Sequence, residues 1–145
     1  MKKVAILGKL KTKFFAPFND YKWDIWTLNY HKEELPRITK WFDIHANGAN
    51  PRADITRKNY PFKSIEKMLG GQYINNTFSY MIAYAIYKGY KEIALYGAKF
   101  LNDAEIRTGQ LLNVRELIFF AKGRGIKVTA PYDEILLNEY ERYGL

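Results

Sequence analysis

The sequence predicts an α/β fold in which a mostly parallel sheet of five strands lies between two layers of helices. Two observations predict it. Short runs of continuous apolar residues, bounded by Gly, Asn, Asp or Pro, recur along the chain and are typical of strands buried on both faces. Segments with apolar residues at helical spacing stand between the later runs, and each ends at a glycine before the next run begins.

Five apolar runs are assigned to strands, and four segments to helices. The strands cover residues 4–7, 25–28, 41–44, 93–96 and 128–130. The two clearest helices begin at Thr77, ending before Gly89, and near Asp103, ending near Lys122, because their apolar residues recur three and four positions apart. Shorter helices are expected over residues 62–69 and 133–143.

The order of these elements predicts one Rossmann-like domain, a three-layer sandwich that spans residues 1–145. Parallel strands need helical, right-handed crossovers, and the expected strand order is 3-2-1-4-5. Two stretches, 87–97 and 121–131, share a pattern in which a helix end, a glycine and a β-rich run follow one another. Residues 47–59 are expected to form a long polar loop, and ordered loops of that length are commonly functional.

Composition limits the classes of function. The chain has 145 residues, no cysteine and a net charge of +8. The absence of cysteine excludes disulfides, thiol catalysis and thiolate metal sites. The apolar run 4–7 is too short for a signal peptide, and no run is long enough to span a membrane. We therefore expect a soluble, cytoplasmic protein, and the basic excess favours an anionic partner.

Open α/β sheets bind ligands at the carboxyl ends of their strands, where the strand order reverses. This rule predicts that the loops after the strands and the start of the helix at Thr77 form one basic, hydrogen-bonding site. The expected ligand-binding residues are Gly8, Lys9, Lys11, Thr12, Lys13, Phe14, Asn29, His45, Asn76, Thr77, Gly97 and Lys99.

Three features of these residues favour a nucleotide. Lys9, Lys11 and Lys13 alternate directly after a buried strand, where they are either solvated surface charges or phosphate contacts. Phe14 lies beside them and offers a ring on which a base could stack. Asn76 and Thr77 begin a helix, whose free N–H groups attract anions, although capping of the helix alone also explains these residue types.

Other chemistry finds less support in the sequence. The segment "GKLKTK" has neither the dinucleotide-binding glycine pattern nor the P-loop pattern. The only histidines are His31 and His45, so a zinc site is not expected, and no metal or cofactor is predicted. Asp43 precedes His45 by two residues, and the two side chains form either a catalytic base with its orienting acid or a structural contact.

The segments "VAILGKLKTKFFAPF", "WDIWTLN", "WFDIH", "NNTFSYMIAYAIYKGYKEIALYGAKF" and "AKGRGIKV" resemble a known group of proteins. The chain is similar to small Rossmann-like proteins encoded by bacteriophages. It is more distantly similar to hydroxymethylpterin pyrophosphokinase (MptE-like) and sialyltransferase-like Rossmann domains. In those relatives an acid follows the Tyr-Gly strand end, and here Lys99 takes its place, which removes a metal ligand and makes the site more positive.

Three functions follow from these observations. The first is capture of a cyclic di- or trinucleotide signal without turnover, as expected of a phage protein that counters CBASS immunity, with a symmetric ligand held by a homo-oligomer such as a dimer or tetramer. The second is a nucleotide- or nucleotide-sugar-dependent transferase or pyrophosphokinase-like enzyme that uses Asp43 and His45, with Asp103 or Glu105. The third, nucleic-acid binding, ranks last because the lysines are dispersed along the chain.

Overall fold

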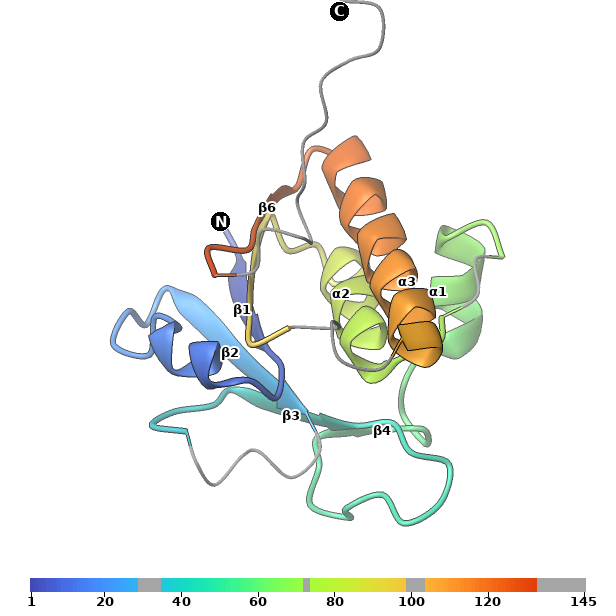
Figure 1. The fold of residues 1–145 in the computed structure, drawn as a ribbon, viewed down its shortest axis with the longest axis horizontal. Helices are drawn as coiled ribbons and strands as arrows, with labels where there is room; N and C mark the ends of the chain where they lie inside the picture. Colours follow the sequence, from blue (N-terminus) through green and yellow to red (C-terminus); the bar gives the residue numbers. More distant parts are fainter. Residues whose placement is uncertain (29–34, 72–73, 99–103, 133–145) are drawn as a thin grey trace, which may run out of the picture.

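The computed structural model describes residues 1–28, 35–71, 74–98 and 104–132, with side chains from residue 109 onward in the last range. These residues form a six-stranded parallel sheet in the order β4-β3-β2-β1-β5-β6 (Figure 1). The strands are β1 (Lys3–Leu7), β2 (Trp23–Leu28), β3 (Lys40–Asp43), β4 (Ile55–Thr56), β5 (Glu92–Tyr96) and β6 (Lys127–Thr129). The predicted order of the five expected strands is confirmed, and β4 adds a sixth at one edge.

Helices lie on both faces of the sheet. One face carries α1 (Phe62–Met68), α2 (Thr77–Tyr87) and α3 (Ala104–Gly123), and the other carries the 3₁₀ helix η1 (Lys11–Phe15) (Figure 1). The expected α-helices over 62–69, from Thr77, and over 103–122 are therefore confirmed to within a residue or two. The helix expected over 133–143 lies outside the described residues.

The alternation of side chains along the strands divides the core into two parts. Residues such as Ile6, Trp26 and Phe42 face the α-helices and belong to the larger hydrophobic cluster. Their neighbours, such as Leu7 and Ile25, face η1 and form a smaller cluster with residues of the segment that follows it. Because both faces are covered, the strands read as continuous apolar runs in the sequence.

The two similar stretches noted in the sequence are equivalent joints in the fold. Each leads from the end of a helix into a strand, α2 into β5 and α3 into β6, through a glycine with positive φ: 82° at Gly89 and 80° at Gly125. A left-handed backbone ends a helix without strain only at glycine. The joints lie side by side, because the Lys127 backbone N–H donates to the Lys91 carbonyl at 3.0 Å.

Two local elements differ from the prediction. The expected loop over 47–59 contains the short strand β4, and Asp54 ties this region to β3 by accepting a hydrogen bond from the Trp41 backbone N–H at 2.8 Å. The segment after β1 forms η1, where a loop was expected. Both elements are too short to leave a periodic signal in the sequence.

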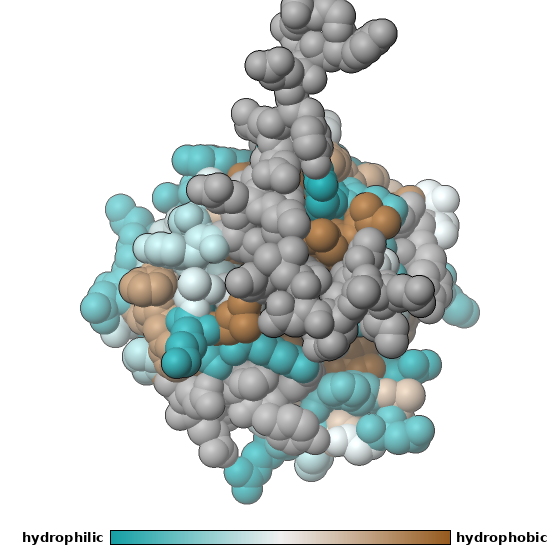
Figure 2. Space-filling model, in the orientation of Figure 1, coloured by the Kyte–Doolittle hydropathy of each residue, from teal (hydrophilic) through white to brown (hydrophobic). Residues whose placement is uncertain are grey.

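The described surface is mostly polar in the orientation of Figure 1. Hydrophilic side chains form much of its outline, and apolar surface appears between them in separate small areas (Figure 2). Within the described ranges, no helix combines the length and apolar character that crossing a lipid bilayer requires.

Candidate functional site at the carboxyl ends of the strands

The loops after β1 and β5 meet through their backbones. The Gly8 N–H donates to the Tyr96 carbonyl at 2.7 Å, and the Leu10 N–H donates to the Gly97 carbonyl at 3.1 Å. The Gly97 N–H donates to Thr12 Oγ1 at 3.0 Å. Three of the predicted site residues, Gly8, Thr12 and Gly97, therefore build the junction between the two central loops.

Both glycines are required by the closeness of this junction. A Cβ atom on Gly8 would stand 2.4 Å from the Gly97 carbonyl oxygen. A Cβ atom on Gly97 would stand 2.9 Å from the Leu10 carbonyl oxygen, at a φ of +69° that also favours glycine. The close approach of two backbones, which the sequence does not reveal, explains both residues.

The three alternating lysines do not share one environment. Lys9 and Lys11 are exposed, whereas the side chain of Lys13 is buried, with 2% of the residue exposed. The 3₁₀ helix turns about 120° per residue, so residues two apart point in different directions. The structure therefore leaves Lys9 and Lys11 as the accessible cations of this loop and places Lys13 inside it.

Two aromatic rings lie on η1, the same helix as Lys11 and Lys13. Phe14 is 48% exposed, and its ring centroid is 5.2 Å from Lys13 Nζ. Phe15 stacks on Tyr132, with ring centroids 4.7 Å apart and planes at 25°. Phe14 therefore presents accessible aromatic surface next to Lys11, as the stacking hypothesis requires.

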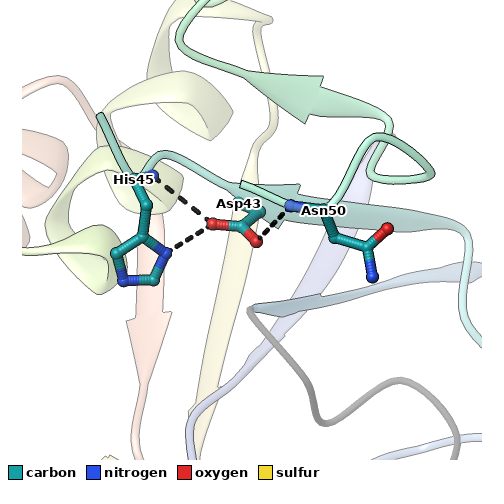
Figure 3. Close-up of polar contacts among 3 residues, drawn as sticks. All are labelled: Asp43, His45 and Asn50. Atoms are coloured by element: carbon teal, nitrogen blue, oxygen red, sulfur yellow. Dashed lines mark hydrogen bonds and ion pairs between the residues drawn. The ribbon is translucent and has the colours of Figure 1, made fainter. Parts of the chain in front are cut away.

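At the end of β3, Asp43 organises the following loop. The residue is fully buried, and its carboxylate accepts hydrogen bonds from His45 Nδ1 at 2.5 Å, the Asn50 backbone N–H at 2.9 Å and the His45 backbone N–H at 3.4 Å (Figure 3). Burial acts to raise the pKa of Asp43, but the hydrogen bonds from Asn50 and His45 outweigh it and lower the pKa. Asp43 is therefore held as a carboxylate.

The imidazole of His45 is fixed on one side and open on the other. Its side chain is 50% exposed, and the second ring nitrogen points away from Asp43 (Figure 3). A carboxylate at Nδ1 fixes the orientation of the ring and favours the tautomer that leaves Nε2 free to accept a proton. This arrangement can support either hydrogen bonding to a ligand or general base catalysis.

The start of α2 is held by a network of amides. Asn76 caps the helix, since its Oδ1 accepts a hydrogen bond from the Ser79 backbone N–H at 2.9 Å. Its amide nitrogen donates to Asn75 Oδ1 and Ser79 Oγ, both at 2.9 Å. Asn113 of α3 accepts from the Asn75 backbone N–H at 3.1 Å, so the network joins α2 to α3. Asn76 therefore caps α2, which is one of the two alternatives that the sequence offers for this residue.

Replacing Asn76 with alanine is expected to destabilise the protein by about 1–2 kcal/mol, the usual effect of losing a helix N-cap. The measurement is urea unfolding followed by circular dichroism. Asn76→Asp keeps an oxygen for the Ser79 N–H and serves as the matched variant, with a smaller loss. An Asn76→Ala protein as stable as the wild type would contradict the capping role.

The remaining predicted residues divide into two groups. Thr77 is the first residue of α2 and is half-buried. Asn29 and Lys99 lie outside the described residues, as do His31, Asp103 and the side chain of Glu105. Within the described ranges, no three His, Cys, Asp or Glu side chains gather closely enough to hold a metal ion.

Two features of the site region were missed by sequence reasoning. The contact between Asp43 and Asn50 closes a turn whose ends are seven residues apart, and no short motif marks it. A separate pocket of about 270 Å³ lies between α1 and the first turn of α2, and contains none of the predicted site residues. It is lined by Tyr60, Phe62, Ile65, Glu66, Gly71, Ile74 and Tyr80.

Comparisons with known proteins show the fold. No protein-family model matches the sequence, and no curated protein is significantly similar to it. Among solved structures, the sialyltransferase CST-II in complex with a trisaccharide acceptor and CMP is similar, with a TM-score of 0.52, 15% identity, and coverage of 89% of this chain and 80% of that chain. The sialyltransferase CstII from Campylobacter jejuni in complex with a substrate analogue, CMP-3FNeuAc, gives a TM-score of 0.50 and 16% identity, with coverage of 90% and 80%. At this identity the likeness extends to the Rossmann-like fold, and it agrees with the predicted resemblance to sialyltransferase-like domains.

Proposed function

We propose that this protein binds a nucleotide at the carboxyl ends of its strands, with phosphate at Lys9 and Lys11 and the base against Phe14. One observation carries the proposal: exposed Lys9, Lys11 and Phe14 occupy a single short segment directly after β1. β1 lies between β2 and β5, where the strand order reverses, and this is where open α/β sheets hold their ligands.

Two further facts support a nucleotide as the ligand. The protein has a net charge of +8, which favours anionic ligands in general. The two similar sialyltransferase structures are complexes with CMP and with the substrate analogue CMP-3FNeuAc. Lysine ammonium groups suit phosphate, while an exposed phenylalanine ring suits any base.

In its narrower form, the proposal is that the ligand is a cyclic di- or trinucleotide signal that the protein holds without converting it, as a phage-encoded counter to host CBASS immunity. This form rests on the resemblance of the sequence to small phage proteins and on a homo-oligomer that would match the symmetry of such a ligand. Release of the intact ligand after heating distinguishes capture from turnover.

The test compares wild-type protein with a Lys9→Gln/Lys11→Gln double variant by calorimetry, using CMP and a set of cyclic dinucleotides. We expect the double variant to raise the Kd at least about tenfold, because two charge-assisted phosphate contacts are lost. Lys91→Gln/Lys127→Gln, at the amino ends of β5 and β6, makes the same change in net charge and is expected to leave the Kd unchanged. Equal weakening by both double variants, or no binding of any nucleotide by the wild type, contradicts the proposal.

The geometry of Asp43 and His45 favours a second candidate function, a nucleotide- or nucleotide-sugar-dependent transferase. The orientation of His45 by a buried carboxylate would let Nε2 remove a proton from an attacking hydroxyl group. This candidate requires turnover of a nucleotide substrate that falls at least about a hundredfold in His45→Ala while binding persists. Recovery of every bound nucleotide unaltered, with and without Mg²⁺, contradicts it.

A further inference from the structure

The end of the sheet at which its strands begin, opposite the candidate site, is strongly basic. In a parallel sheet all strands begin at the same end of the sheet, so the residues that lead into β1, β2, β5 and β6 come together there. These residues are 1–3, 20–24, 88–92 and 122–127, and we call them the amino-end basic edge. They include eight basic and three acidic residues: Lys2, Lys3, Lys22, Lys88, Lys91, Lys122, Arg124 and Lys127, with Asp20, Asp24 and Glu92.

Hydrogen bonds place three of these segments in direct contact. The Lys91 backbone N–H donates to the Lys2 carbonyl at 2.9 Å, and the Lys127 backbone N–H donates to the Lys91 carbonyl at 3.0 Å. The ammonium group of Lys2 also approaches the Lys88 carbonyl at 3.5 Å. Lysines far apart in the sequence are therefore neighbours at the amino ends of these strands.

The positive charge of this surface is accessible and largely uncompensated by its own acids. All the basic residues of the edge except the half-buried Lys3 are exposed. Glu92 pairs with Lys3 at 3.8 Å, and the carboxylate of Asp24 accepts a hydrogen bond from the Tyr90 hydroxyl. Asp20 accepts a hydrogen bond from the Lys22 backbone N–H. None of these contacts involves the side chains of Lys91 or Lys127.

Folding alone explains part of this charge. α2 and α3 end at this edge, and the partial negative charge of a helix C-terminus stabilises nearby cations such as Lys88 and Lys122. It also accounts for Lys2, whose ammonium group approaches the Lys88 carbonyl at the end of α2, but it does not explain Lys91 and Lys127. These two lie in a turn and on a strand, where like charges in close proximity oppose folding. Their accumulation favours an anionic partner.

We propose that the amino-end basic edge binds single-stranded nucleic acid through its phosphate backbone. The lysines follow the starts of four neighbouring strands, an extent of about 14 Å at ~4.8 Å per strand, so they form a row that suits a linear polyanion better than a small ligand. Two exposed rings lie near the same strand starts. Tyr21 is 81% exposed, with the Arg37 guanidinium carbon 4.7 Å from its ring centroid, and Tyr87, the last residue of α2, is 40% exposed. Unpaired bases stack on such rings. This site lies at the opposite edge from the proposed nucleotide site and is independent of it.

The experiment measures fluorescence anisotropy of a labelled 20-nucleotide single strand against the full chain over a range of salt concentrations. Wild-type protein is expected to bind, with log K falling linearly against log salt. Lys91→Gln/Lys127→Gln should weaken binding at low salt at least about tenfold and reduce the slope by ~1.4, at about 0.7 per phosphate contact in a single strand. Lys63→Gln/Lys67→Gln, which changes two exposed residues of α1 and makes the same change in net charge, should behave as the wild type.

Parallel titrations identify the class of polyanion. A duplex of the same length, vesicles containing phosphatidylserine, and polyglutamate are each measured under the same conditions, and weaker binding than to the single strand supports the proposal. Tighter binding of the duplex, the vesicles or polyglutamate overturns it. Absence of binding by wild-type protein, or equal weakening by the two double variants, also overturns it. Thermal unfolding of each variant confirms that a loss of binding is not a loss of fold.

Discussion

Gly8→Ala is expected to destabilise the protein by about 3 kcal/mol or more, enough to prevent folding if the wild type is marginally stable. The added Cβ atom would lie 2.4 Å from the carbonyl oxygen of Gly97 and 2.8 Å from its carbonyl carbon, and both belong to the backbone. A backbone cannot move aside as a flexible side chain can. Relief of the clash would separate the loops after β1 and β5, and this separation would break the hydrogen bond between the Leu10 N–H and the Gly97 carbonyl.

The measurement for Gly8→Ala is the free energy of unfolding in urea, with the yield of soluble protein as a second readout. Gly123→Ala is the matched control. Gly123 closes α3, and a Cβ atom there would meet no heavy atom within 4 Å, so this change is expected to be neutral or to stabilise by up to about 1 kcal/mol. A Gly8→Ala protein as stable as Gly123→Ala would show that the two loops are not closely packed.

Asp43→Asn is expected to destabilise the protein by about 2–3 kcal/mol near neutral pH. The buried carboxylate accepts three hydrogen bonds, two from backbone N–H groups and one from His45, and an amide offers one oxygen and a competing donor. One of the N–H groups in the loop would then face another donor. Asp20→Asn removes the same charge from an exposed residue and is expected to cost much less.

The effect of Asp43→Asn should depend on pH. The folded state lowers the pKa of Asp43 below its ordinary value of 3.8, so the ionised carboxylate contributes stability at pH values above 3.8. That contribution is lost as the pH falls from 3.8 through the lower pKa of the folded state. The difference in unfolding free energy between wild type and Asp43→Asn should therefore be constant near neutral pH and shrink in acid. A difference that grows below pH 3.8 would contradict this assignment.

The two edges of the sheet divide the charge of the protein between two proposed roles. The carboxyl-end edge presents Lys9, Lys11 and Phe14 as a compact site, with the fixed imidazole of His45 two strands away, about 10 Å at ~4.8 Å per strand. The amino-end basic edge presents a longer row of lysines. The Lys9→Gln/Lys11→Gln and Lys91→Gln/Lys127→Gln variants separate the roles, because each removes two positive charges from one end of the strands and leaves the other end intact.

The sequence by itself determined the arrangement of the main elements. Continuous apolar runs identified five strands, glycine stops after helical patterns identified both joints into β5 and β6, and the order of elements predicted the strand order. These signals are local and arise from burial of a whole strand or helix face, so they can be read from neighbouring residues. The same topology is the basis for proposing a site at the carboxyl ends of the strands.

Only the tertiary structure decided what individual residues do there. In and before the 3₁₀ helix, Lys13 is buried while Lys9 and Lys11 are exposed. Gly8 and Gly97 are 89 positions apart in the sequence, and the fold brings their backbones into contact. The lysines of the amino-end basic edge are dispersed in the sequence and become neighbours only when parallel strands align their starts. Such contacts depend on distance in space between segments remote in the chain, and no local pattern of residue types encodes that distance.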